Sequence, residues 1–248
     1  MEKNIRYIIF SLVLLANQAF AQLIHSHNDY EQKEPFYAAY NLGFDSIEAD
    51  LYIKNGKLYV AHDWKDINRK RTFKSLYWKP LMAKIKANKG YAYANKKELY
   101  LLLDLKKDGK QILAVLDKLF KHHRKDLKHV HITISGDMPK PEEFEQYDKL
   151  MFFDGRRNTQ YSDKAYERVD MVSASFLDFG KYWPGKQQLP EETYQNIRAF
   201  VMANHAKGKR VRIWGTPNTT LAFETLKKLE VDFIGTDDLE LLKNFVDK

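Results

Sequence analysis

Short apolar segments with strand character alternate with amphipathic helical segments along nearly the whole chain. Near-continuous apolar strands that alternate with helices are typical of a parallel sheet. Eight such units in about 230 residues predict a single-domain (β/α)8 barrel of the TIM type, an α/β fold. Strands are predicted over residues 22–27, 46–53 with a hairpin extension over 57–61, 99–106, 130–135, 150–153, 171–176, 210–214 and 231–235. Helices are predicted over residues 34–42, 72–88, 111–122, 191–206, 220–229 and 239–246.

The N-terminal segment has the three parts of a secretory signal peptide. Lys3 and Arg6 precede an apolar stretch that is too short to span a membrane, and the triplet ending at Ala21 has the A-x-A form of a cleavage site. We therefore expect residues 1–21 to be removed, the barrel to occupy residues 22–248, and the protein to be periplasmic or secreted. The alternative is an uncleaved N-terminal anchor. The chain has no cysteine, which excludes disulfides.

The composition is that of a globular protein with an excess of positive charge. The formal net charge is +8, and the lysines are spread widely, with local concentrations in 65–74 and 121–128. Most of them are expected to lie on solvated helix faces, although a basic surface also attracts anionic lipids and phosphate esters. The chain has no nucleic-acid-binding motif, so nucleic acid is excluded as a partner. No stable membrane insertion is expected after removal of the signal segment.

Charged side chains gather at the predicted carboxyl ends of three strands. Residues two apart on a strand share a face, so Glu48 and Asp50 face the barrel together, as do Asp104 and Lys106. Catalytic groups of TIM barrels come from this rim. Converging carboxylates repel one another unless a cation joins them, and Mg²⁺ and Ca²⁺ prefer oxygen ligands. We therefore expect one divalent cation, Mg²⁺ or Ca²⁺, on Glu48, Asp50 and Asp104. The alternative is a structural network in which these carboxylates pair with Lys106 and Arg212.

Histidines are expected at the same rim. His25 and His27 share a face at the end of the first strand, and the Asn55-Gly56 hairpin returns His62 towards the carboxylates. Two imidazoles beside a metal suit general acid and general base catalysis. They also keep a transition metal open as the cation. The other histidines are expected to be exposed, to end a helix, or to have no assigned role: His122, His123, His129, His131 and His205.

Five segments taken in order resemble the phosphatidylinositol phospholipase C-like phosphodiesterase superfamily, and most nearly its glycerophosphodiester phosphodiesterase-like branch. They are HSHNDYE, GFDSIEADLYIKNGKLYVAHD, LLLDLK, VRIWGTPN and VDFIGTDDL, and the resemblance covers nearly all of the chain beyond the signal segment. It implies a TIM-type barrel in which two histidines act beside one divalent cation on a phosphodiester. By resemblance, one histidine of the 25/27 pair and His62 are catalytic, and the three carboxylates Glu48, Asp50 and Asp104 bind the metal.

Neighbouring residues are expected to position the catalytic imidazole and the substrate. We expect Asp29 to orient the imidazole, and Asn28 to hold it or to contact the substrate or the metal. Of the two histidines we favour His27, because it adjoins the Asn-Asp pair, and His25 remains the other candidate. Three further residues are expected to bind the substrate: Lys106, Arg212 and, by resemblance, Trp214.

The chain also departs from the usual glycerophosphodiesterase pattern. That branch has His-Arg-Gly after the first strand and Pro-Glu-Asn shortly afterwards, and neither occurs at these places here. Asp104 stands where many glycerophosphodiesterases have Glu, and Asp104 with Lys106 is similar to the D-x-K of spider sphingomyelinase D. The cation that meets the phosphate would therefore be the metal, Lys106 or Arg212. The expected substrate is a small-molecule or lipid-headgroup phosphodiester, of glycerophosphodiester or phospholipid type.

Two other functions fit parts of the pattern. The barrel can bind a phosphorylated or sugar ligand without turnover. It can also be a metal amidohydrolase, in which His25 and His27 are metal ligands together with His131 and Asp237. For a phosphodiesterase, both direct hydrolysis and a cyclic phosphate intermediate fit. The aromatic segment 176–185 is expected either to line the rim or to pack between helices.

Overall fold

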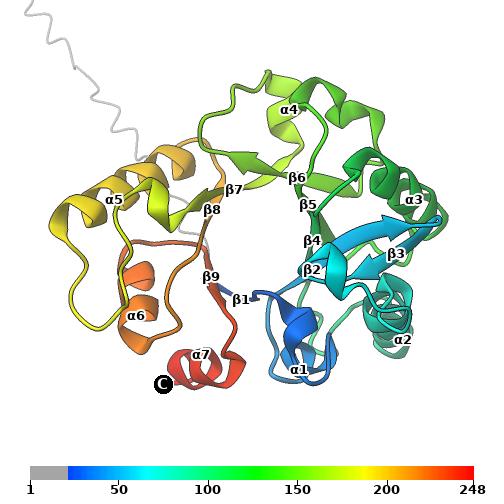
Figure 1. The fold of residues 1–248 in the computed structure, drawn as a ribbon, viewed down its shortest axis with the longest axis horizontal. Helices are drawn as coiled ribbons and strands as arrows, with labels where there is room; N and C mark the ends of the chain where they lie inside the picture. Colours follow the sequence, from blue (N-terminus) through cyan, green and yellow to red (C-terminus); the bar gives the residue numbers. More distant parts are fainter. Residues whose placement is uncertain (1–21) are drawn as a thin grey trace, which may run out of the picture.

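The computed structural model describes residues 22–248, which form a closed parallel barrel surrounded by helices (Figure 1). The strand order is β1-β9-β8-β7-β6-β5-β4-β2-β3, and an additional pairing of β1 with β2 closes the barrel. β3 pairs antiparallel with β2 and extends it outward as a hairpin. The predicted TIM-type barrel is therefore confirmed. The strands of the described residues are β1 (Leu23–Ser26), β2 (Ser46–Lys54), β3 (Lys57–Val60), β4 (Leu99–Leu105), β5 (Val130–Gly136), β6 (Met151–Arg156), β7 (Val169–Ser175), β8 (Arg210–Trp214) and β9 (Phe233–Thr236).

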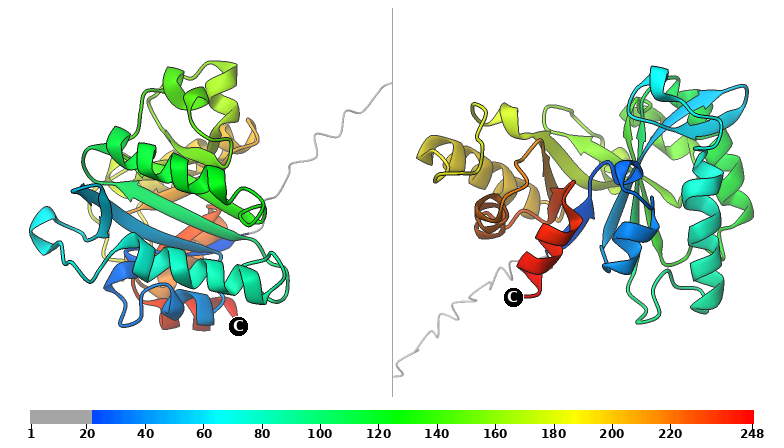
Figure 2. Two further views of the ribbon diagram at one scale, coloured as in Figure 1. Left: turned by 90° about the vertical axis from the view of Figure 1, so that its right-hand side faces the viewer. Right: turned by 60° about the horizontal axis from the view of Figure 1, so that its bottom comes forward.

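The helices lie around the outside of the barrel (Figures 1 and 2). Within the described residues they are α1 (Tyr37–Asn41), α2 (Lys79–Ala87), α3 (Gly109–His122), α4 (Asp163–Glu167), α5 (Glu191–His205), α6 (Thr220–Lys228) and α7 (Leu239–Val246). The helix predicted over 72–88 begins as a π-helical turn at Lys74–Trp78 and continues as α2. The sequence did not predict α4, because five residues are too few to show a helical period.

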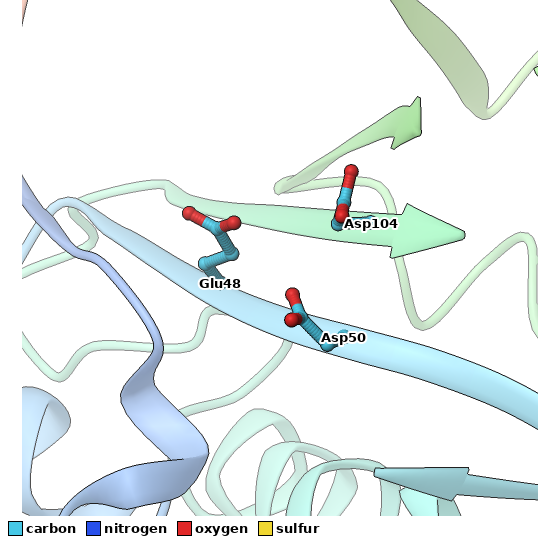
Figure 3. Close-up of side chains that lie close together, drawn as sticks. All are labelled: Glu48, Asp50 and Asp104. Carbon is cyan, nitrogen blue, oxygen red and sulfur yellow. The ribbon is translucent and has the colours of Figure 1, made fainter. Parts of the chain in front are cut away.

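Strand β2 shows how the alternation of residues builds both the core and the polar interior. Ile47, Ala49 and Leu51 are fully buried on one face of the strand. Glu48 and Asp50 lie on the opposite face and point towards Asp104 of the neighbouring strand (Figure 3). In the register of the sheet, Asp50 is the partner of Asp104 in β4. The sheet therefore brings Asp50 and Asp104 to one height in the barrel, with Glu48 two residues earlier on the same face of β2.

The apolar core occupies two places. A large cluster fills the space between the strands and the helices, where each fully buried apolar side chain contributes roughly 1.5–3 kcal/mol. A small second cluster of Tyr100, Leu102, Met171 and Phe233 lies inside the barrel. Leu102 precedes Asp104 on the same face of β4, so this cluster fills the end of the barrel away from the carboxylates. The carboxylates Glu48, Asp50 and Asp104 therefore lie on the carboxyl-terminal side of this cluster.

The predicted signal segment, residues 1–21, lies outside the described residues, and its cleavage stays a prediction. Within residues 22–248, no helix is long and apolar enough to cross a membrane.

Candidate active site

Three carboxylates converge at the carboxyl-terminal end of β2 and β4. Ligand oxygens of Glu48, Asp50 and Asp104 all lie within 4.8 Å of one another (Figure 3). Glu48 and Asp50 are buried, and Oδ1 of Asp50 has no hydrogen-bond partner. Burial and the nearby charge of Glu48 raise the pKa of Asp50 to about 6. A buried carboxylate oxygen without a partner is unfavourable, so this group of oxygens fits a hard divalent cation.

The same carboxylates are paired with the two cationic side chains that the sequence placed there. Nζ of Lys106 lies 2.7 Å from Oδ2 of Asp50 and 2.7 Å from Oδ2 of Asp104. Nη2 of Arg212 donates to Oε2 of Glu48 at 3.0 Å. Although burial opposes ionisation of Glu48, the Arg212 guanidinium and the His25 hydrogen bond outweigh it and hold the pKa of this carboxyl below its ordinary value. The metal-ligand geometry and the alternative ion-pair network are thus built from the same residues.

His25 is buried beside Glu48. Its Nε2 lies 2.8 Å from Oε2 of Glu48, and its Nδ1 lies 2.7 Å from Oγ of Ser46. Burial lowers the pKa of His25 to about 4, although the hydrogen bond with Glu48 works in the opposite direction. A neutral imidazole that donates from Nε2 accepts from Ser46 through Nδ1, so both ring nitrogens are engaged. His25 therefore holds the carboxylate of Glu48 in place.

His27 lies at the rim and is partly exposed. Its Nδ1 donates to Oδ1 of Asp237 at 2.8 Å, and Oδ2 of Asp237 accepts from Nδ2 of Asn218 at 3.2 Å. Burial opposes the protonated form of His27, but the hydrogen bond with Asp237 and the charges of Glu48 and Asp237 outweigh it and raise the pKa of the imidazole. Nε2 of His27 is then the atom that can exchange a proton with a substrate.

The hairpin returns His62 to the rim. Val60 pairs with Leu51, and the hydroxyl of Tyr52 donates to the carbonyl oxygen of His62 at 3.2 Å. The imidazole is exposed, with Nδ1 3.6 Å from Oδ2 of Asp63. Among the described residues, no hydrogen bond or ion pair joins this imidazole to the three carboxylates.

The residues after the first strand have different partners from those expected. Asp29 is buried and accepts hydrogen bonds from Oγ of Ser26, the backbone N–H of Phe36 and the hydroxyl of Tyr77. It therefore fixes the loop after β1, and Asp237 takes the orienting position beside His27 that was expected of Asp29. Oδ1 of Asn28 lies 2.7 Å from the hydroxyl of Tyr30.

The sequence did not predict the contacts that Tyr30 and Asp237 make in this site. The hydroxyl of Tyr30 also lies 2.7 Å from Oδ2 of Asp50, so it can donate to the cation site or to Asn28. The tyrosine follows the Asn-Asp pair directly, and that position was the only available signal. Asp237 was considered only as an amidohydrolase ligand. It belongs to the final strand's GTDDL segment, and its meeting with His27 follows from the pairing of β1 with β9.

The aromatic residues divide between rim and core. Trp214 is exposed at the end of β8, as expected of a rim residue. Trp183 is buried, donates from Nε1 to the carbonyl oxygen of Gln187 at 2.8 Å and stacks on Phe176. Tyr182 is exposed. The segment 176–185 thus combines packing residues with exposed ones.

The residues of the alternative amidohydrolase site do not come together in the structure. His131 lies near the start of β5, with Nε2 2.7 Å from Oε2 of Glu98 and its ring stacked on Tyr100. That is the end of the barrel opposite to His27 and Asp237. The only group of potential metal ligands within residues 22–248 is Glu48, Asp50 and Asp104, and it contains no histidine.

Comparison with known proteins identifies the type of barrel. Residues 15–131 match the AIM6-like phosphodiesterase domain. An altered inheritance of mitochondria protein 6 homolog of Arthroderma benhamiae is 26% identical, over 90% of this chain and 83% of that protein. Altered inheritance of mitochondria protein 6 of Eremothecium gossypii is 25% identical, over 90% of this chain and 69% of that protein.

Solved structures share the fold. The crystal structure of a glycerophosphodiester phosphodiesterase from Parabacteroides distasonis has a TM-score of 0.59 and 15% identity, and it covers 92% of this chain and 98% of its own. A glycerophosphodiester phosphodiesterase from Agrobacterium tumefaciens has a TM-score of 0.52 and 14% identity, with 92% and 100% covered. At such identities the likeness establishes the fold.

The predicted periplasmic or secreted location is wrong. The relatives are named for altered inheritance of mitochondria, which points to a mitochondrial or other cellular role. The matched region also begins at residue 15, inside the segment expected to be removed. A short basic and apolar N-terminal segment does not by itself define a compartment.

The fold and the family match agree with the resemblance drawn from the sequence. The chain is a TIM-type barrel with the fold of solved glycerophosphodiester phosphodiesterases, and residues 15–131 match the AIM6-like phosphodiesterase domain.

Proposed function

We propose that the protein is a metal-dependent phosphodiesterase that acts on a small-molecule or lipid-headgroup phosphodiester. The observation that carries this proposal is the convergence of Glu48, Asp50 and Asp104 within 4.8 Å, with a buried Asp50 oxygen that has no partner. These residues would hold one Mg²⁺ or Ca²⁺. When bound, such a cation supplies positive charge against the charge that develops on phosphorus.

The protein's own residues supply the proton transfers. Because Nδ1 of His27 is held by Asp237, its Nε2 takes or gives the proton. His62 is the second imidazole, and its exposure just beyond the end of β3 leaves it able to approach a bound substrate. His25 keeps Glu48 in position and remains neutral at pH 7, because burial lowers its pKa to about 4. Asn28 and Trp214 are proposed to contact the substrate at the rim.

The His27–Asp237 pair favours an enzyme over a non-catalytic ligand-binding barrel. A barrel that only binds a phosphorylated ligand needs cations at its mouth, but it does not need a partly exposed imidazole whose tautomer is fixed by a carboxylate. The amidohydrolase alternative lacks support, because His131 lies at the far end of the barrel.

The test is hydrolysis of a panel of glycerophosphodiesters and lipid-headgroup phosphodiesters, with Mg²⁺, with Ca²⁺ and with excess chelator. We expect activity that chelation abolishes and added cation restores. His27→Ala should lower turnover by about 10²- to 10⁴-fold, the usual effect of losing an acid or base. His122→Ala is the matched control, since His122 lies at the end of α3 and bonds only to the carbonyl of Lys118 among the described residues.

Two results would contradict the proposal. Undiminished turnover by metal-free protein in excess chelator would exclude metal dependence. Saturable binding of phosphorylated ligands without turnover of any diester, with either cation present, would identify a binding protein instead.

A further inference from the structure

The chain lacks the arginine that glycerophosphodiesterases carry beside the first catalytic histidine, and two expected substitutes are already engaged. Nζ of Lys106 is bound between Asp50 and Asp104 at 2.7 Å from each. The Arg212 guanidinium is buried and bonded to Glu48. A cation that already neutralises a carboxylate at close range has less of its charge available to a substrate anion.

A third cation at the rim, Arg156, was not anticipated. It ends β6, and its side chain is 38% exposed. Its guanidinium lies 3.5 Å from Oδ2 of Asp154, 3.4 Å from Oγ of Ser135 and 3.5 Å from the carbonyl oxygen of Gly136. All three distances are at the long limit of hydrogen bonds, which have a usual N···O distance of about 2.9 Å. The guanidinium is therefore bonded only weakly to these three groups, and its N–H groups can donate to a ligand.

Arg156 lies next to a buried carboxylate of its own strand. Asp154, two residues earlier on β6, is fully buried, and its Oδ1 has no hydrogen-bond partner. The guanidinium thus lies beside a buried carboxylate and is itself partly exposed to solvent.

Sheet register places Arg156 close to the carboxylate cluster. Ser135 on β5 is the partner of Asp104 on β4, and β6 is the next strand. Gly136 approaches Asp104 so closely that a Cβ on this glycine would lie 2.7 Å from Oδ1 of Asp104. The guanidinium contacts both Ser135 and Gly136, so one residue separates it from the third proposed metal ligand. An anion bound at this edge of the cluster would lie within reach of the guanidinium.

We propose that Arg156 binds a nonbridging phosphate oxygen of the substrate and so replaces the arginine missing beside the first histidine. The inference rests on the proposed phosphodiesterase function. Asp154 and Ser135 hold the guanidinium at the rim, and a phosphate oxygen accepts from it in the charge-assisted geometry that arginine favours.

The experiment compares Arg156→Gln with Arg157→Gln. Arg157 is the next residue, but its Nη1 donates to the carbonyl oxygen of Asp178 at 2.7 Å and its guanidinium lies over Phe179, so it provides a matched control. Two quantities are measured: kcat/KM for a phosphodiester that the wild type hydrolyses, and the affinity for inorganic phosphate by calorimetry with Mg²⁺ present. Arg156→Gln should lower both by about 10- to 100-fold, the usual range for a charge-assisted hydrogen bond. Arg156→Lys should restore part of each, and Arg157→Gln should change neither.

The phosphate measurement separates this inference from the proposed function. If the wild type hydrolyses no phosphodiester but binds phosphate, and only Arg156→Gln weakens that binding, the function fails and the role of Arg156 stands. Equal phosphate affinity in the wild type and in folded Arg156→Gln overturns the role of Arg156. Reduced thermal stability of Arg156→Gln with unchanged phosphate affinity also overturns it and leaves Arg156 as a structural partner of Asp154. The role of Arg156 is also overturned if the wild type binds no phosphate and Arg156→Gln has the same kcat/KM as the wild type.

Discussion

Two histidines that are neighbours on one face have opposite electrostatic surroundings. His25 points into the barrel, where burial lowers the pKa of its imidazole to about 4. His27 lies at the rim, where Asp237 and Glu48 outweigh the effect of burial and raise the pKa of its imidazole. The neutral imidazole of His25, with both ring nitrogens hydrogen-bonded, is suited to holding Glu48. The imidazole of His27, hydrogen-bonded to a carboxylate at the rim, is suited to proton transfer. These surroundings support our proposal of His27, and not His25, as the residue that transfers a proton.

Asp237→Asn should lower the pKa of His27. The asparagine removes both the hydrogen bond to a carboxylate and one negative charge, while the opposing effect of burial remains. NMR titration of the His27 ring measures the shift, and the acidic limb of a pH–rate profile should move in the same direction. Asp238→Asn is the control, because Asp238 caps α7 through the backbone N–H of Leu241. An unchanged His27 pKa in Asp237→Asn would show that another group sets it.

Candidate site residues were predictable where alternation within a strand, or the pairing of two neighbouring strands, determines their position. Glu48 and Asp50 follow from alternation within β2, and Asp104 follows from the pairing of β2 with β4. Asp237 and Arg156 were missed because their significance depends on partners in other strands. His27 and Asp237 are 210 residues apart in the chain. Such contacts form only when the first and last strands pair to close the barrel, and no local sequence pattern predicts them.

At the scale of elements, long apolar strands and periodic helices were predictable, whereas short turns were not. The predicted helix over 111–122 is α3, and the predicted strand over 210–214 is β8. The helix predicted over 34–42 shortens to α1, and the π-helical turn at Lys74–Trp78 gave no sign in the periodicity. The long elements form because burial of an apolar face stabilises them. The short ones depend on contacts that appear only after the barrel has closed.

The end of β5 should be sensitive to the smallest added side chain. Gly136 has φ +77°, and a Cβ there would lie 2.3 Å from the carbonyl oxygen of Leu105 and 2.7 Å from Oδ1 of Asp104. Gly136→Ala should therefore displace Asp104, lower the affinity for Mg²⁺ or Ca²⁺, and reduce the free energy of unfolding. Chemical denaturation and cation titration measure the two effects.

Gly208→Ala provides the control for Gly136→Ala. Gly208 has φ +70°, but a Cβ there would meet nothing within 4 Å. It should lose only the roughly 1–2 kcal/mol that a left-handed conformation costs a residue with a Cβ, with cation affinity unchanged. Equal losses of stability in both variants, with cation affinity retained, would mean that β5 relaxes away from Asp104.

The whole molecule combines an apolar shell with a charged interior at one end. The large cluster between strands and helices and the small one inside the barrel stabilise the fold. The opposite end buries Glu48, Asp50, Asp154 and Arg212 in the same interior. Buried charges stabilise a fold only when every one is well paired. Oδ1 of Asp50 and Oδ1 of Asp154 have no hydrogen-bond partner, so this end of the barrel is less stable than a fully paired one would be.

Asp50→Asn should therefore separate stability from cation binding. Burial and Glu48 raise the pKa of Asp50 from 3.8 to about 6, so its ionised form destabilises the native state by an amount on the order of 2–3 kcal/mol. This destabilisation is fully present above pH 6 and disappears as the pH falls towards 3.8. In chelator at pH 8, Asp50→Asn should unfold at a temperature equal to or above that of the wild type, because loss of the ion pair with Lys106 offsets only part of the gain.

Added cation should reverse this order. A ligand that binds only the native state stabilises it, by about 2.7 kcal/mol at one hundred times its Kd. Mg²⁺ or Ca²⁺ should therefore raise the Tm of the wild type and leave that of Asp50→Asn nearly unchanged. The measurement is thermal unfolding of both proteins between pH 4 and pH 8, with chelator and with cation. A stability difference that stays constant over this pH range would mean that Asp50 is not a strained carboxylate. Equal cation-dependent stabilisation of both proteins would mean that the cation binds elsewhere, because the variant keeps the size of the side chain and loses only the charge that a divalent cation requires.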